Sequence, residues 1–469
     1  MNRALALGAL ALAACGGCAS DASPELSGDV VLITVDALRA DYFTPELAPN
    51  LSRLAGEGLT FTSARANSSH PLQSTATLLT GLLPTRGGSI GLLEAEPSEE
   101  AETLAESFSS AQVLTGLVSS QPLLGGDGFR RGYADIQVAR PGEVWSADEV
   151  ASRASEVLED AGERPCFLHV HFADPHEPHV ASTPPALSFA DIRKRIAEGA
   201  VGDALCTAEE LEALRAAYRA EIAAVDTAVG TLLRSINERS NPDGALIVFT
   251  STCGEEFLEH GYVGHSWTLH DEALRVPLFF HSPGRISAAQ NEQNVSLVDV
   301  APSLAAFLDL TERRIGFDGD SLLEGDGPAL LGDRETLAEL VIRERCVLRA
   351  VVTQDVKFVS ADLWHEPSER RAISAGYIET VRAAAAGELE LPEVFGEPTL
   401  ELLYDLKNDP GERTSLGAMS RVSKSQLRAI LEDYREYCAA HGLAPRAAEV
   451  IPSFSDSSEA DALEALGYL

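Results

Sequence analysis

The chain has 469 residues, of which 45% are hydrophobic and 23% charged, with 72 Asp and Glu against 36 Lys and Arg. This apolar content excludes a disordered chain. The formal net charge of -36 argues against nucleic acid or an anionic membrane surface as a partner, because both attract basic protein faces. Seven cysteines are too few for a disulfide scaffold, and an odd number leaves at least one unpaired.

Residues 1–27 are predicted to be a lipoprotein signal and a tether. Arg3 precedes an uncharged Ala/Leu run at 4–14, which is shorter than the roughly 20 residues of a membrane-spanning helix. The run ends at Cys15, and this ending resembles the bacterial lipoprotein signal, in which the Cys is lipidated. The alternatives are cleavage by an ordinary signal peptidase and a cysteine pair formed by Cys15 and Cys18. We expect an extracytoplasmic protein whose lipid holds it on a bacterial membrane, facing the periplasm or the cell surface.

The body of the chain is predicted to be an α/β fold with a mostly parallel central sheet flanked by helices. Continuous apolar runs are typical of strands that are buried on both faces, and long stretches at helical spacing separate them. The expected strands are 29–35, 167–172, 245–250 and 276–280. One helix is expected to begin at Pro49, and two others are expected at 71–79 and 209–236.

From about residue 348 the pattern changes to short alternating strands at 348–353, 356–360 and 402–406, which predicts a small antiparallel α+β subdomain. Helical spacing returns at 426–438 and 460–466. We therefore divide the chain into a signal and tether (1–27), an α/β core (28–332), a C-terminal subdomain (333–418) and a helical tail (419–469).

Several polar motifs lie where ligands of α/β sheets collect, just after the predicted strands. These motifs, in their order along the chain, resemble the sulfatase family of the alkaline-phosphatase superfamily. They cover 32–41, 78–86, 174–179, 250–261, 264–265, 403–406 with 409–412, and 463–469. The resemblance extends from about residue 29 to the end of the chain, and it implies the alkaline-phosphatase-like form of the predicted fold.

The resemblance implies particular site residues. A divalent cation, Ca²⁺ or Mg²⁺ in the family, would lie on Asp36 and on the positions of Thr252 and Cys253. A nucleophile would stand at a helix N-terminus, where an anion is favoured. His176 matches a His that binds substrate oxygen, and His265 matches one near the leaving group.

The sequence departs from the family at these working positions. Counting back from the motif at 80–81 puts Pro71 at the nucleophile position, and proline has no nucleophilic atom. Thr252 replaces a ligating Asp and Cys253 replaces a His or Asn, so a hydroxyl and a soft thiol stand where a hard cation needs carboxylate oxygen. Ala37 replaces a second Asp of many sulfatases, and Ser266 stands where Gly is usual.

Structural roles are also open to these residues. Asp36 could be a helix cap or turn residue, and His176 lies in a turn-forming loop. Ser69 and Ser74 flank Pro71 and could substitute for the nucleophile, although a helix cap explains them more simply. The remaining polar and thiol groups near these motifs, His260, Glu256 and Cys253, are expected to brace the loop or stay unreactive.

Three functions agree with this sequence. The favoured one is a catalytically impaired or inactive sulfatase-like lipoprotein, without a cofactor, that binds an anionic small molecule or glycan. The second is an active sulfate- or phosphate-ester hydrolase with a rearranged site, in which Asp36, His176, His265 and Cys253 hold Zn²⁺. The third is a surface partner protein whose acidic exterior matters and whose pocket is a relic.

Overall fold

The computed structural model describes residues 28–443, except 93–94, 178–184, 240–243, 309, 311–315, 343–345, 364–399 and 417–420. The predicted signal with Cys15 and the motif at 463–469 lie outside the described residues.

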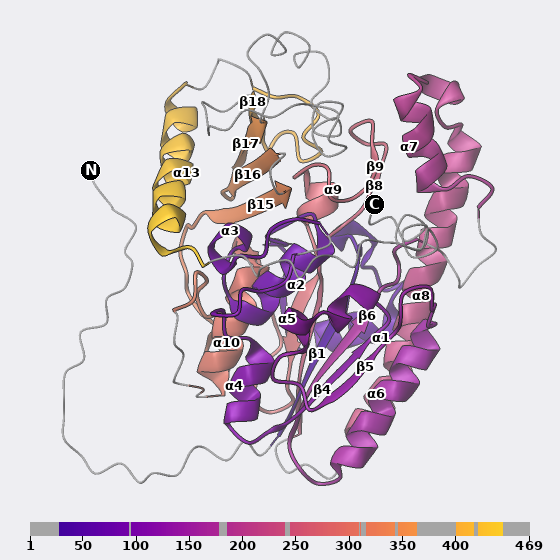
Figure 1. Cartoon of the computed structure of the whole chain (residues 1–469), viewed down its shortest axis with the longest axis vertical. Coiled ribbons are helices and arrows are strands. Elements are labelled where there is room, and N and C mark those ends of the chain that lie inside the picture. The colour runs from indigo at the N-terminus through magenta and orange to yellow at the C-terminus, as the bar shows by residue number, and fades with distance from the viewer. Residues whose placement is uncertain are drawn as a thin grey trace.

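An eight-stranded sheet forms the centre of the molecule (Figure 1). The strand order is β11-β2-β10-β7-β1-β6-β4-β5, and every neighbouring pair is parallel except the two that include β10. These strands are β1 (Asp29–Val35), β2 (Leu59–Phe61), β4 (Leu114–Ser119), β5 (Asp135–Val138), β6 (Cys166–Phe172), β7 (Ala245–Ser251), β10 (Leu278–His281) and β11 (Ala289–Asn291).

Helices cover both faces of this sheet, which explains the continuous apolar runs of its central strands. In β1, Val31 and Ile33 face one layer, while Val30 and Leu32 face the other. The first layer holds α1 (Pro49–Gly56), α6 (Ala147–Ala161), α7 (Phe189–Ala197) and α8 (Ala208–Glu238). The second layer holds α2 (Pro71–Thr80), α4 (Leu104–Ser110) and α10 (Val300–Phe307).

Short elements complete the core around these layers. The helices are α3 (Pro84–Gly87), α5 (Asp127–Arg130) and α9 (Asp271–Leu274). The strand pairs are β3 (Ala64–Arg65) with β12 (Val295–Ser296), β8 (Glu256–Phe257) with β9 (Val263–Gly264), and β13 (Leu323–Glu324) with β14 (Gly327–Pro328).

A second, antiparallel sheet of four strands follows the core. Its strands are β15 (Thr336–Ile342), β16 (Cys346–Val352), β17 (Val356–Leu363) and β18 (Leu400–Asp405). One face packs on α13 (Arg421–His441), where Leu427 and Leu431 contact Phe358. The other face contacts Leu269 and Leu274 of the core. The predicted fold class, a mostly parallel sheet with flanking helices and a C-terminal antiparallel sheet, is confirmed.

A buried lysine ties the second sheet to the core. Lys357 of β17 is fully buried, and its Nζ lies 2.6 Å from both Asp271 Oδ1 and Glu412 Oε1. The same ammonium group donates a hydrogen bond to the Leu269 carbonyl at 3.0 Å. Because a buried cation is tolerated only when it is paired, these contacts fix β17 over the start of α9.

Helix α1 takes its N-terminal cap from another helix. Ala48 precedes the helix and has no capping side chain. Asp226, a buried residue of α8, accepts hydrogen bonds from the backbone N–H groups of Asn50 (3.1 Å) and Leu51 (2.8 Å). A carboxylate at a helix start satisfies the free N–H groups and interacts favourably with the helix dipole.

We expect Asp226→Ala to lower the free energy of unfolding by about 2 kcal/mol or more, because it leaves buried N–H groups without acceptors. Urea denaturation followed by circular dichroism measures this change. Asp148→Ala is the matched control, since Asp148 is an exposed carboxylate in the first turn of α6. Equal losses in the two variants would contradict this role of Asp226.

Candidate functional site

The parallel strands β1, β4, β6 and β7 all end at one edge of the main sheet, so the residues that follow them meet there. Asp36 follows β1, Thr252 follows β7, Gln121 follows β4, and His176 follows β6. All four are buried. This edge is therefore a closely packed polar site on an apolar sheet.

Both carboxylate oxygens of Asp36 are bonded to protein groups. The Thr252 hydroxyl donates to Oδ1 at 2.5 Å. Gln121 Nε2 donates to Oδ2 at 3.3 Å, and His171 Nε2 lies 3.2 Å from the same oxygen. Burial raises the pKa of Asp36, but the charge and hydrogen bond of His171 and the Thr252 hydroxyl outweigh it and lower the pKa to about 2. The side chain is an ionised, fully engaged acceptor at neutral pH.

A line of buried side chains leads away from Asp36 along one face of the sheet. Thr34 Oγ1 lies 2.8 Å from His171 Nδ1 and 2.8 Å from His169 Nε2, and His169 Nδ1 lies 3.2 Å from the Tyr133 hydroxyl. The hydroxyl groups and ring nitrogens of this line can each donate to or accept from a neighbour. Burial, with the adjacent His171 ring, lowers the pKa of His169 to about 3, in agreement with a neutral ring.

The start of α2 lies at the same edge and carries Pro71 as its first residue. Ser74, within the first turn, donates from Oγ to the Ser68 carbonyl at 2.8 Å and accepts from the Ser68 N–H at 3.2 Å. Thr75 donates to the Pro71 carbonyl at 2.9 Å. The hydroxyl of Ser74 is thus used to hold the loop against the helix, and Pro71 offers no reactive atom.

Three histidines gather beside this helix start. The rings of His176 and His265 lie 4.7 Å apart, and His265 Nδ1 lies 3.0 Å from Glu255 Oε1. Burial and the neighbouring His265 lower the pKa of His70 to about 3 and that of His176 to about 4. Both rings are therefore neutral at pH 7, although each would gain a proton more readily beside an anion.

Three polar atoms at this edge lack hydrogen-bond partners among the described residues. They are Nδ1 of His70, Oγ of Ser69 and Nε2 of His171, all in nearly inaccessible side chains, and the last lies 3.2 Å from Asp36 Oδ2. A neighbouring strained residue fixes the local backbone, since Ser266 has φ of +67° and donates its N–H to the Ser69 carbonyl at 3.0 Å. Buried polar atoms without partners are free to bind a ligand.

A sequence profile of the sulfatase family matches residues 28–310. The chain belongs to the sulfatase family, within the alkaline phosphatase superfamily. It is 27% identical over 482 residues to choline-sulfatase of Rhizobium meliloti (strain 1021), covering 88% of this chain and 86% of the relative. It is 25% identical over 451 residues to arylsulfatase A of Homo sapiens, covering 81% of each.

Solved structures show the same sulfatase fold. The phosphonate monoester hydrolase of Agrobacterium radiobacter superposes with a TM-score of 0.64 at 21% identity, over 88% of this chain and 95% of that chain. A protein solved in complex with its substrate, D-glucosamine-2-N,6-O-disulfate, gives a TM-score of 0.68 at 17% identity, over 88% and 99%. At these identities the likeness concerns the fold.

The groups around Asp36 do not fit the hard cation that the sulfatase resemblance implies. Asp36 Oδ1 accepts from Thr252 and Oδ2 from Gln121, so a cation would share each oxygen with a hydrogen-bond donor. Burial and the negative charges of Asp36 and Glu255 raise the pKa of the Cys253 thiol well above its ordinary value. A neutral hydroxyl and a protonated thiol are poor ligands for Ca²⁺ or Mg²⁺.

The structure brings together most of the residues singled out from the sequence. Asp36, Thr252, His176 and His265 lie at this edge, as predicted, but the set proposed for Zn²⁺ does not form a compact group of ligand atoms. Sequence reasoning missed the four groups that support Asp36: Tyr133, His169, His171 and Gln121. The alternation of His169 and His171 in an otherwise apolar strand was the available signal.

No helix within the described ranges is long and apolar enough to cross a bilayer.

The low pKa of Asp36 predicts a pH-dependent contribution to stability. Its folded pKa of about 2 lies below the model-compound value of 3.8, so the contribution is complete above about pH 5 and is lost as the pH falls toward 2. We expect the difference in free energy of unfolding between the native chain and Asp36→Asn to shrink by about 1 kcal/mol from pH 6 to pH 3.

Urea denaturation at the two pH values measures this difference. Thr227→Val, an exposed change on α8 that removes no titratable group, is the control and should show no pH-dependent difference from the native chain. A constant difference for Asp36→Asn would contradict the low pKa.

Proposed function

We propose that this chain is an extracytoplasmic lipoprotein with a sulfatase fold that does not hydrolyse esters and binds an anionic ligand at the polar edge of its main sheet. The proposed loss of catalysis rests on Pro71. This proline is the first residue of α2 and stands at the family's nucleophile position. The groups beside Asp36 support it, because the Thr252 hydroxyl and the Cys253 thiol, whose pKa is raised by burial, are poor ligands for a substrate-polarising hard cation.

The proposed ligand is a sulfate or phosphate ester, or a sulfated glycan. Two relatives are named choline-sulfatase and arylsulfatase A, and these names support a sulfated ligand. His70, His176 and His265 would bind the anion, with the first turn of α2 and its dipole beside them. Because burial lowers the pKa of His70 and His176, the binding of an anion would draw protons onto these two rings.

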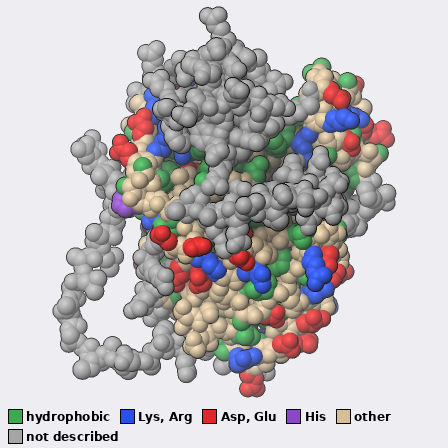
Figure 2. Space-filling model, in the orientation of Figure 1, with side chains coloured by type: hydrophobic (Ala, Val, Ile, Leu, Met, Phe, Trp, Pro, Cys, Tyr) green, Lys and Arg blue, Asp and Glu red, His purple; other side chains and the backbone are tan. Residues whose placement is uncertain are grey.

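The membrane is the second proposed partner, through a lipid on Cys15. The short basic start, the apolar run at 4–14 and the Cys at its end support this anchor. The anchor would hold the acidic body outside the cytoplasm. On the face shown in Figure 2, described acidic and basic side chains are interspersed, which is consistent with the expectation that nucleic acid is not a partner.

A rearranged hydrolase is the alternative, and one observation favours it. The Ser69 hydroxyl is buried, lacks a hydrogen-bond partner among the described residues, and directly precedes His70. A serine nucleophile is activated by a hydrogen bond to a base, so the Ser69 hydroxyl would have to turn toward a histidine of this edge, such as His70, whose Nδ1 also lacks a partner among the described residues. Under this alternative, ester turnover would depend on Ser69.

We expect the purified full chain to show no turnover of aryl sulfate or aryl phosphate esters, and to bind sulfate in isothermal titration calorimetry. His265→Gln should weaken sulfate binding about tenfold, the effect of removing one hydrogen bond to a charged group. His441→Gln is the control. This exposed ring belongs to α13 and not to the polar edge, so the substitution should leave the sulfate affinity unchanged.

The outcomes separate the three functions. Turnover that disappears in Ser69→Ala or Asp36→Ala would establish the hydrolase and overturn our proposal. Absence of both turnover and sulfate or phosphate binding would overturn the anion-binding part and favour a protein that acts through its surface.

A further inference from the structure

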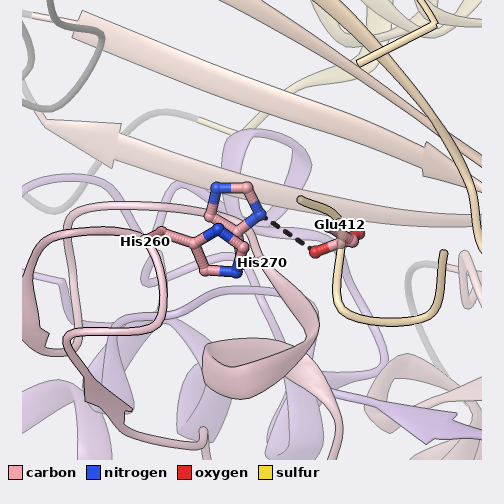
Figure 3. A group of neighbouring side chains, drawn as sticks. All are labelled: His260, His270 and Glu412. Carbon is pink, nitrogen blue, oxygen red and sulfur yellow. Dashed lines mark hydrogen bonds and ion pairs between the residues drawn. The ribbon is translucent and has the colours of Figure 1, made fainter. Parts of the chain in front are cut away.

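A second group of titratable side chains lies outside the polar edge, where the core meets the C-terminal sheet (Figure 3). His260 follows β8, His270 immediately precedes α9, and Glu412 comes from the turn after β18. One ligand atom of each side chain lies within 4.8 Å of the others. Among the described residues, this is the group of His, Cys, Asp and Glu that is compact enough to hold a metal ion.

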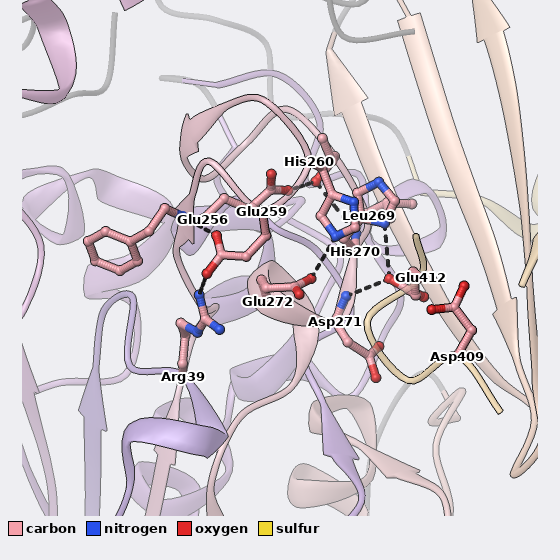
Figure 4. A network of polar contacts seen from close by, with 12 residues as sticks. Arg39, Glu256, Glu259, His260, Leu269, His270, Asp271, Glu272, Asp409 and Glu412 are labelled. Carbon is pink, nitrogen blue, oxygen red and sulfur yellow. Dashed lines mark hydrogen bonds and ion pairs between the residues drawn. The ribbon is translucent and has the colours of Figure 1, made fainter. Parts of the chain in front are cut away.

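The two imidazoles form a close stack. Their ring centres are 3.6 Å apart and their planes differ by 6°. His270 Nδ1 lies 3.0 Å from Glu412 Oε2, and His260 Nε2 lies 3.0 Å from Glu272 Oε2 (Figures 3 and 4). His260 is thus held at one nitrogen by Glu272, a carboxylate outside the group, and this is the usual support for a metal-binding histidine.

A buried carboxylate beside this stack has an oxygen to spare. Glu256 is 1% exposed, and one of its oxygens accepts from the Thr268 hydroxyl. Its Oε2 has no hydrogen-bond partner among the described residues. Thr268, which holds this carboxyl group, is two residues before His270, and Glu256 is drawn in the same network (Figure 4). Glu256 is not among the three residues whose ligand atoms all lie within 4.8 Å of one another, so its side chain would have to move to reach an ion there. A buried oxygen without a partner has lost its hydrogen bonds to water and has gained none from the protein.

The formal charge of the surroundings is negative. Four carboxylates are packed here (Glu256, Asp271, Glu272 and Glu412), against two cations, Arg65 and Lys357. The carboxylates outnumber the arginine and lysine cations, so this cluster would attract a divalent cation. Unbalanced charge in a buried cluster is costly, because the protein interior screens it poorly.

We propose that His260, His270, Glu412 and Glu256 form a zinc site that clamps the C-terminal sheet to the core. Two imidazoles and two carboxylates match the ligands and the fourfold coordination of Zn²⁺, whereas Ca²⁺ and Mg²⁺ prefer six or more oxygens. A ring nitrogen binds a metal in the plane of its ring, so one ring turns out of the stack on binding. Glu412 then exchanges its bond to His270 for a bond to the ion.

The test is zinc binding by the purified full chain, measured by competition with a chelating dye and by the visible spectrum of Co²⁺ bound in its place. We expect one tight site with the spectrum of four nitrogen and oxygen ligands and no thiolate band. His260→Gln and Glu256→Gln should each weaken zinc binding by at least about tenfold. Zinc should also raise the midpoint of thermal unfolding in the native chain but not in these variants.

Two matched controls place the ion. His441→Gln removes an exposed histidine, and Asp36→Asn changes the polar edge of the main sheet, so both should keep the native zinc affinity. Unchanged affinity in His260→Gln and Glu256→Gln, or loss of zinc in Asp36→Asn alone, would overturn the proposal. Circular dichroism of each variant establishes that it is folded, and His260 is a suitable target because it is only partly buried.

Discussion

The carboxylate of Asp36 is the point on which the polar edge of the sheet depends. It lies at the end of the central strand, where burial alone would favour its protonated form, and three neighbouring strands supply the groups that keep it ionised. The bonds from Thr252, Gln121 and His171 join β7, β4 and β6 to β1. The buried charge of Asp36 is thereby compensated by protein groups alone.

The two sheets are joined by a small number of buried charges. Lys357 comes from the second sheet, Asp271 comes from α9 of the core, and Glu412 comes from the turn after β18. Arg65 binds Asp271 through two nitrogens from the other side. Each of these charged groups compensates part of the charge of the next one. Removal of one partner would therefore leave another buried charge uncompensated. The relative position of the sheets is thereby fixed by electrostatics as well as by apolar contact.

Much of the fold could be predicted from local patterns, because strands buried on both faces are continuously apolar. The predictions near β1, β6 and β7 are confirmed in this way. Strands β4 and β5 were missed because small and polar residues interrupt their apolar pattern, and β15 was missed as well. The predicted strand at 276–280 forms as β10, which is antiparallel to its neighbours, a direction that periodicity does not encode.

The candidate site was predictable where a residue directly follows a strand, as Asp36 and Thr252 do, or lies in the loop after it, as His176 does. Its supporting groups depend on strand register, since Thr34 meets His171 only because β1 and β6 pair in that alignment. A single sequence contains no record of that pairing.

The hydrogen bonds from Tyr133 through His169 and Thr34 to His171 lie on one face of the main sheet and end beside Asp36. All five side chains are buried, so water cannot replace a lost partner. Loss of one of these groups would therefore leave a polar atom of its neighbour without a partner, and the effect of a substitution at Tyr133 would extend from the edge of β5 to β1.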